Sequence, residues 1–291
     1  MQVWGGVAGK RLLITGATNG IGLAAAIELA RRGAELTLIA RNPARAEQAV
    51  RQISVAASSR GVPDVLLADL SSQASIRQVA SQALSKYSSI QVLVNNAGAI
   101  YDPRQLSGDG IELTWAVNHL APFLLTTLLL DRIKASAPAR IITTSSGAHE
   151  RARIPFDDLN AERSWGGMGF TRYGETKLAN ILFTVELARR LEGSGVTANA
   201  FHPGFVATGF NTNNSLLMRI GMTLARPFGR NAEKGAETLV WLADSEDARA
   251  VSGGYFYDKR QVTPAPAARD RDAARRLWEI SEAQTQVTAG R

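Results

Sequence analysis

Short apolar runs alternate with longer helical stretches almost from the start of the chain, and this alternation most limits the folds open to it. The predicted strands cover residues 11–15, 35–40, 64–69, 91–96, 139–145, 196–202 and 254–257. The predicted helices cover 20–32, a stretch after Pro43, a stretch opened by Ser71 or preferably Ser72, and 107–135, 170–193, 232–243 and 267–285. Runs that are apolar on both faces are typical of parallel sheets covered by helices on each side. We therefore predict a single α/β domain over residues 1–291, with a doubly wound parallel sheet of about seven strands.

Composition excludes several kinds of chemistry. The chain of 291 residues has no cysteine, so disulfides, thiolate metal sites and cysteine nucleophiles are absent. Its net charge of +7 comes from 33 basic and 26 acidic residues that are scattered rather than interleaved with aromatics. We therefore expect no nucleic-acid partner. His119, His149 and His202 have no metal-ligand spacing, so we expect no metal site.

The chain shows no sign of a targeting or spanning segment. Residues 1–10 lack an apolar stretch behind a basic start, so we expect no signal peptide. The longest apolar run, near 120–130, is interrupted by Pro122 and threonines and is too short to span a bilayer. These features predict a soluble, cytoplasmic protein.

A glycine-rich turn joins the first predicted strand to its helix. It contains Gly16, Thr18, Asn19, Gly20, Ile21 and Gly22. Glycines let the backbone approach a pyrophosphate, and the N-terminus of the following helix offers free N–H groups and a partial positive charge. The spacing G-x-x-x-G-x-G departs from G-x-G-x-x-G, and a tight turn without a ligand is the alternative.

The end of the second predicted strand carries Arg41 and Asn42. At this place an acidic residue would bind the ribose 2′-hydroxyl of NAD, whereas an arginine accommodates a 2′-phosphate. The sequence therefore predicts NADP(H) as cofactor. A surface arginine at a strand end is the alternative.

Tyr173 and Lys177 lie four residues apart on a predicted helix, so they share one face. A neighbouring ammonium is expected to lower the pKa of the phenol, which could then exchange a proton with a carbonyl or alcohol. An unremarkable surface pair is the alternative.

Several motifs together resemble the short-chain dehydrogenase/reductase family over about residues 9–260. They are the glycine turn, Asp69-Leu70, Asn95-Asn96-Ala97-Gly98, Tyr173-x-x-x-Lys177 and Pro203-Gly204. The resemblance implies a Rossmann-like fold, a nicotinamide cofactor, hydride transfer between an alcohol and a carbonyl, and a homodimer or homotetramer.

The resemblance also implies roles for single residues. Ser146, with Ser145 as the alternative, would hydrogen-bond the substrate oxygen, and Asn118 would help hold a water for a proton relay to Lys177. Lys177 would in addition bind the ribose of the nicotinamide. The remaining cofactor contacts implied are Asp69 and Leu70 near the adenine, Asn96, Ala97 and Gly98 along the adenosine ribose, and Pro203, Gly204, Val206 and Thr208 at the nicotinamide end.

Within the family, residues 145–149, 117–123 and 177–184 resemble the retinol dehydrogenase-like branch and its bacterial relatives. We expect this protein to lack the N-terminal membrane anchor of many animal members. The alternatives are an NAD-preferring or C=C-reducing relative, similar to protochlorophyllide reductases, and a non-catalytic cofactor-sensing scaffold. Residues 204–231 mix aliphatic and basic side chains and are predicted to be a lid over an apolar, medium-sized substrate. A subunit interface and a membrane-surface contact are the alternatives for this segment.

Overall fold

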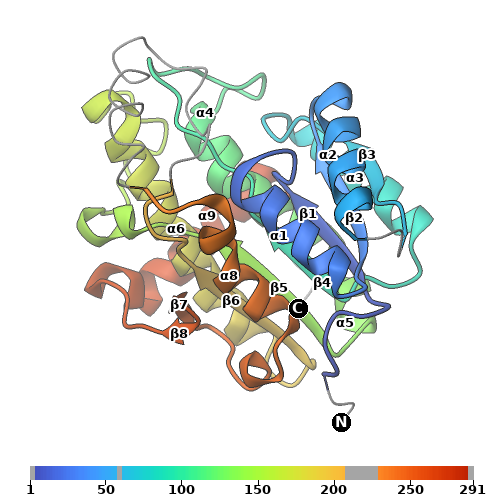
Figure 1. The fold of residues 1–291 in the computed structure, drawn as a ribbon. Coiled ribbons are helices and arrows are strands. Elements are labelled where there is room, and N and C mark those ends of the chain that lie inside the picture. The colour runs from blue at the N-terminus through green and yellow to red at the C-terminus, as the bar shows by residue number, and fades with distance from the viewer. Residues whose placement is uncertain (1–3, 58–60, 207–228, 288–291) are drawn as a thin grey trace.

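The computed structural model describes residues 4–57, 61–206 and 229–287, which form one α/β domain (Figure 1). Its sheet has the strand order β3-β2-β1-β4-β5-β6-β7-β8, and all neighbours are parallel except β7 and β8. The strands are β1 Arg11–Thr15, β2 Glu35–Ala40, β3 Asp64–Leu67, β4 Val92–Asn95, β5 Ala139–Thr144, β6 Val196–Phe201, β7 Tyr255–Tyr257 and β8 Arg260–Gln261. The Rossmann-like prediction is confirmed. The two-residue β8 was not predicted, since so short a strand leaves no periodic signal.

Helices cover both faces of the sheet (Figure 1). They are α1 Gly20–Arg31, α2 Pro43–Ala56, α3 Gln73–Lys86, α4 Leu113–Trp115, α5 Ala121–Ala135, α6 Phe170–Arg190, α8 Ala232–Asp244 and α9 Arg271–Thr285. Ser72 caps α3 by accepting a hydrogen bond from Ser75 N, and Pro43 stands at the first turn of α2, both as predicted. The helix predicted over 107–135 was wrong at its start: residues 107–112 form a loop, and a π-helical turn, η1 Ala116–Leu120, lies between α4 and α5.

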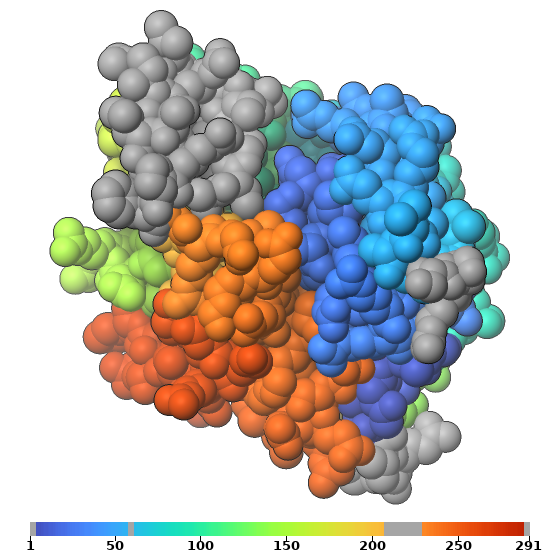
Figure 2. Space-filling model, in the orientation of Figure 1, coloured from blue at the N-terminus to red at the C-terminus, as the bar shows by residue number. Residues whose placement is uncertain are grey.

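Alternate residues of the central strands face opposite helical layers. Leu13, Leu93 and Ile141 pack with α3, α5 and α6. Leu12, Val94 and Ile142 pack with α1 and α8, which Figure 2 shows side by side in blue and orange. Because both faces are buried, the strands are apolar throughout, which explains why the sequence predicted a parallel sheet.

One helical stretch among the described residues, Leu113–Ala135, is long and apolar enough to cross a membrane. The sequence predicted that the apolar run near 120–130 is too short to span a bilayer, and this holds for that run but not for the whole helical stretch. In the fold, 83% of its most apolar window is buried, with Phe123, Leu124 and Leu129 in the core that α5 shares with α3, α6 and the sheet. This burial is that of a core helix.

The strand order reverses between β1 and β4, which are neighbours in the sheet although β2 and β3 intervene in the chain. Ligands of open α/β sheets bind in the crevice at such a switch point, beyond the carboxyl ends of the strands. The segments that follow β1, β4 and β5 meet at this crevice, and the candidate site lies there.

Candidate active site

A cavity of about 720 Å³ opens at the carboxyl ends of β1, β4 and β5. It is lined by almost every residue that the sequence predicted for a cofactor or for catalysis: Gly16, Thr18, Asn19, Gly20, Ile21, Gly22, Arg41, Asp69, Leu70, Asn96, Ala97, Gly98, Ser146, Tyr173, Lys177, Pro203, Gly204 and Val206. Asn42 and Asn118 do not line it, and Thr208 lies outside the described residues.

The glycine turn forms one end of the cavity. Gly16 and Gly20 have φ of +70° and +53°, a backbone region in which side chains are strained. A Cβ on Gly22 would lie 2.2 Å from the carbonyl oxygen of Gly16, so the turn closes only when this position is glycine. Asn19 precedes α1 without a side-chain capping hydrogen bond to it. The N-terminal amides of α1 therefore face the cavity without that cap.

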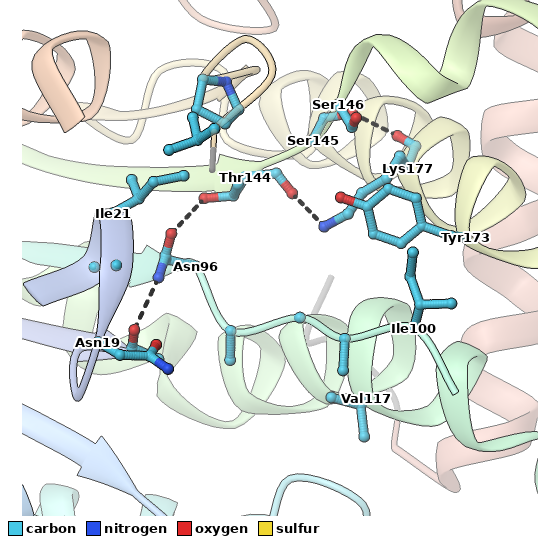
Figure 3. Close-up of a pocket in the computed structure, with 18 of the residues that line it drawn as sticks. Asn19, Ile21, Asn96, Ile100, Val117, Thr144, Ser145, Ser146, Tyr173 and Lys177 are labelled. Atoms are coloured by element: carbon cyan, nitrogen blue, oxygen red, sulfur yellow. Dashed lines mark hydrogen bonds between the residues drawn. The ribbon is translucent and has the colours of Figure 1, made fainter. Parts of the chain in front are cut away.

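Asn96 holds the three central strand ends together. Its Nδ2 donates to the carbonyl oxygens of Thr15 and Gly16, each at 3.2 Å, and its Oδ1 accepts from Thr144 Oγ1 at 3.2 Å (Figure 3). Thr15 Oγ1 in turn accepts from the backbone N–H groups of Asn96 and Ala97. These bonds fix the spacing of β1, β4 and β5 at the floor of the crevice.

Two arginines line the cavity beyond the end of β2. Arg41 was predicted, whereas Arg45, one turn into α2, was not. Asn42 was predicted to contact the cofactor, and this contact stays a prediction: its Oδ1 accepts from Arg45 N at 3.0 Å and caps α2. Asparagine is a favoured N-cap, and Pro43 after it was the signal that could have revealed this role.

The two candidate serines point in different directions. Ser145 is buried, and its hydroxyl donates to the carbonyl oxygen of Lys177 at 2.7 Å (Figure 3). Ser146 is partly exposed, and its Oγ accepts from Ala148 N at 3.2 Å and is hydrogen-bonded to Tyr173. The geometry therefore favours Ser146 over Ser145 as the serine that meets a ligand.

Tyr173 and Lys177 lie together on α6 and face the cavity (Figure 3). Lys177 Nζ lies 5.3 Å from the centroid of the Tyr173 ring and donates to the carbonyl oxygen of Thr144 at 3.1 Å. Burial lowers the pKa of Lys177 to about 8. Burial also raises the pKa of Tyr173 to about 12, against the hydrogen bond from Ser146, which lowers it. The pKa of the phenol is therefore raised, where the sequence predicted a lowering, because desolvation disfavours the phenolate.

Asn118 lies beneath the cavity on the π-helical turn and is fully buried. Its side-chain amide exchanges two hydrogen bonds of 2.8 Å with the backbone of Ala99 and donates to Thr176 Oγ1 at 3.1 Å. A Cβ on Gly98 would lie 3.3 Å from both Asn118 Oδ1 and Lys177 Nζ, so these two groups flank Gly98. The proton-relay role of Asn118 stays a prediction.

Sequence reasoning missed two residues that place Tyr173. A Cβ on Gly174 would lie 2.8 Å from the carbonyl oxygen of Ala148, so glycine lets α6 approach the serine turn. Arg172, 1% exposed, bonds Glu112 and Glu175 at 2.8 Å each and ties α6 to the cap of α4. The sequence carried no signal for this, because Glu112 is 60 residues away.

The end of the cavity beyond β6 is closed by Pro203, Gly204 and Val206. Val206 forms a β-bridge with Arg230, whose side chain bonds Asp258. The predicted lid, residues 204–231, thus has both its ends beside the cavity. Its central part, 207–228, lies outside the described residues.

The fold and this cavity define a class of enzymes that bind a nicotinamide dinucleotide and act as oxidoreductases on CH–OH and C=O groups. The family model of the short chain dehydrogenase matches residues 10–158, and the chain belongs to this family.

Curated relatives and solved structures agree with this family assignment. The chain is 43% identical to retinol dehydrogenase 12 of Homo sapiens and 42% identical to retinol dehydrogenase 14 of Mus musculus, with 94% of this chain and 85% of each relative covered. An uncharacterized protein from Mycobacterium Paratuberculosis has a TM-score of 0.78 at 32% identity, covering 98% of this chain and 97% of that one. A short chain dehydrogenase from Burkholderia cenocepacia, solved in complex with NADP, has a TM-score of 0.68 at 25% identity, covering 91% and 99%.

Proposed function

We propose that this protein transfers a hydride between NADP(H) and the alcohol/carbonyl pair of an apolar, medium-sized substrate. The observation that carries the proposal is the arrangement of one continuous cavity. It has the glycine turn and two arginines on one side and the Ser146–Tyr173–Lys177 group on the other. A dinucleotide needs an anion-binding turn and a reacting centre within one crevice, and this cavity offers both.

The residues at the reacting end have complementary chemical tasks. The nicotinamide supplies or accepts the hydride when the cofactor is bound. Tyr173 gives a proton to the substrate oxygen in reduction and takes it back in oxidation. Ser146 accepts a hydrogen bond from Ala148 N and donates its own hydroxyl hydrogen toward Tyr173. A substrate oxygen that enters beside Tyr173 can take over this hydrogen bond as charge develops there. Lys177 places a cation beside the phenol.

Preference for NADP(H) rests on Arg41 and Arg45. Two guanidinium groups line the cavity beyond β2, where the sequence Ala40-Arg41-Asn42 offers no carboxylate for a ribose 2′-hydroxyl. Arginine binds phosphate through several N–H groups at once and keeps its charge at any physiological pH.

An apolar substrate is supported by the side chains around the Tyr173 end of the cavity. Ile100, Val117, Phe170 and Phe205 line it, and the two phenylalanines are 44% and 49% exposed. Exposed aromatic groups at the mouth of a cavity favour a ligand that covers them.

Cofactor preference is tested by the ratio of kcat/KM for NADP(H) to that for NAD(H). We expect the wild type to favour NADP(H) and Arg41→Asp to lower the ratio about 10- to 100-fold, the loss typical of one hydrogen bond to a charged group. Arg51→Asp is the matched control, because Arg51 lies on α2, is exposed and pairs with Glu47 outside the cavity. A wild type that favours NAD(H) would refute the proposal.

The substrate class is tested with a panel of aldehydes, ketones and alcohols of increasing chain length, followed by absorbance of the reduced cofactor. We expect kcat/KM to rise with apolar length up to the room that the cavity provides. Turnover that falls with apolar length would contradict an apolar substrate while leaving the oxidoreductase chemistry intact.

A further inference from the structure

His149 lies directly behind the serine turn and belongs to none of the groups that line the cavity. It sits in the 3₁₀ turn η2 Gly147–Arg151, is 2% exposed, and folds its ring back onto the residue that opens the turn. Its Nδ1 lies 2.8 Å from the carbonyl oxygen of Ser146, and its Nε2 accepts from Ala265 N at 3.2 Å. The ring therefore joins the serine turn to the chain that follows β8.

These two partners fix the tautomer of the ring. A backbone N–H can only donate, so Nε2 must be unprotonated to accept from Ala265. The proton of a neutral imidazole then sits on Nδ1 and is donated to Ser146. Protonation of the ring would put a hydrogen on Nε2, so that Nε2–H and the N–H of Ala265 would be two donors facing each other.

The serine turn needs such support because it has left the sheet. The last β5–β6 pairing is Thr144 with Phe201, and Ser145 N still donates to Phe201 O, but the next residue has no ladder partner in the described chain. The carbonyl of Ser146 is bonded by His149 N at 3.2 Å and, more closely, by the His149 ring. The hydroxyl of the same serine is hydrogen-bonded to Tyr173.

We propose that His149 is a positioning residue for Ser146: its ring, anchored by Ala265 and protonated on Nδ1, holds the serine backbone so that the hydroxyl faces Tyr173. This inference rests on the proposed function, in which Ser146 meets the substrate oxygen. Tyr255 supports the ring from β7, with its centroid 5.0 Å away and its hydroxyl 3.4 Å from Nδ1.

The electrostatic surroundings keep the ring neutral. Burial lowers the pKa of His149, whereas the hydrogen bond to the Ser146 carbonyl and the carboxylate of Glu150 raise it. His202, which follows β6, is neutral at neutral pH because burial lowers its pKa to about 4. Tyr255 is protonated there, because burial raises the pKa of its phenol. The net effect on His149 is a lower pKa, so Nε2 stays an acceptor for Ala265 at neutral pH and the single ring proton stays on Nδ1.

The first test compares two amide replacements. The amide nitrogen of asparagine can take the place of Nδ1, so His149→Asn keeps a donor for Ser146; the longer glutamine reaches the place of Nε2, so His149→Gln keeps only the partner of Ala265. We expect His149→Asn to keep most of the kcat, and His149→Gln and His149→Phe to lose about 10- to 100-fold, as for a reacting group misplaced by about 1 Å. The KM for cofactor should stay unchanged in all three. Equal losses in His149→Asn and His149→Gln would overturn the proposal.

The second test asks whether the effect acts through the serine. In a Ser146→Ala background, His149→Gln should cost less than about twofold in kcat, because residues that act as one unit are not additive. A loss as large as in the wild type would show a merely structural role and overturn the proposal. Full kcat in Ser146→Ala alone would instead refute the role of Ser146 in the proposed function.

A third measurement does not depend on activity. The ¹⁵N resonances of the His149 ring in the wild type, assigned by comparison with His149→Asn, should show a protonated Nδ1 and an unprotonated Nε2 at neutral pH. A protonated Nε2 at that pH would overturn the proposal even if every variant lost its turnover.

Discussion

The two ends of the cavity are built by different means. The glycine-turn end is shaped by backbone: Gly16 and Gly22 have no room for a Cβ, and Asn96 bridges main-chain carbonyls. The reacting end is made of buried side chains, with Tyr173 and Lys177 facing one another across a few ångströms. At the first end, the shape of the backbone and the N-terminal N–H groups of α1 meet the ligand. At the second end, the side chains that meet it have pKa values changed by burial.

This difference separates the effects of mutation. Adding an atom at the glycine-turn end should disturb binding of the dinucleotide and leave the proton-transfer groups as they are. Removing a polar atom at the reacting end should slow the reaction and leave the dinucleotide bound.

The largest expected effect is that of Tyr173→Phe. Loss of the hydroxyl removes the proton donor, and we expect kcat to fall about 10²- to 10⁴-fold, the usual contribution of a general acid. The dissociation constant of NADPH, measured by fluorescence titration, should change by less than about threefold, because phenylalanine keeps the ring (a change of this size is under 1 kcal/mol).

Tyr87→Phe is the control for Tyr173→Phe, since Tyr87 bonds Asp64 on the outer part of the sheet and is remote from the cavity. Its turnover should equal that of the wild type. Normal turnover in Tyr173→Phe would show that the reacting end does not depend on the proton of Tyr173 and would contradict its proposed role.

Gly22→Ala should have the next largest effect. The added methyl would stand 2.2 Å from the Gly16 oxygen and 2.5 Å from Asn96 Nδ2, so α1 must move away from the turn. We expect affinity for NADPH to fall at least about tenfold, with a loss of stability of about 1–3 kcal/mol, as for other overpacked sites.

Gly108→Ala provides the matched control, because a Cβ there meets nothing within 4 Å and the residue lies in an exposed loop. Cofactor titration and thermal unfolding should distinguish the two variants. Unchanged cofactor affinity in Gly22→Ala would show that the turn accepts a methyl group without moving. It would contradict the view that close backbone packing shapes this end of the site.

The smallest effect concerns Lys177 and pH. Burial lowers its pKa from 10.5 to about 8, so between these values the unfolded chain binds a proton that the folded chain does not. The free energy of unfolding should therefore rise with pH across this window, relative to Lys177→Met, and the difference should be flat below pH 8. Urea unfolding of both proteins at several pH values measures this difference in the free energy of unfolding. A difference that does not change up to pH 10.5 would contradict a lowered pKa of Lys177.

Local patterns in the sequence predicted the elements that depend on local physics. The buried strands, the cap at Ser72 and the proline start of α2 all follow from side chains within a few residues of one another. The start of the helix predicted over 107–135 was wrong, because the backbone of residues 107–112 bonds within its own loop and to Asn160, 48 residues from Glu112.

The candidate site divides in the same way. The glycine turn, Arg41 and the Tyr173–Lys177 spacing could be found from motifs. Arg45 and the role of His149 could not, since the first depends on how α2 is placed beside the cavity and the second on Ala265, which is 116 residues from His149. The choice between Ser145 and Ser146 also needed the structure, because both hydroxyls follow the same strand and only packing against α6 turns one of them away.

By itself, the sequence determined the layered α/β architecture and the edge of the sheet at which ligands bind, because strand and helix periodicities are local and the carboxyl ends of parallel strands share one edge. Only the tertiary structure decided how the reacting groups ionise. Desolvation comes from residues distant in the chain, and it raises the pKa of Tyr173 and lowers that of Lys177, where the spacing of the pair alone suggested an acidified phenol.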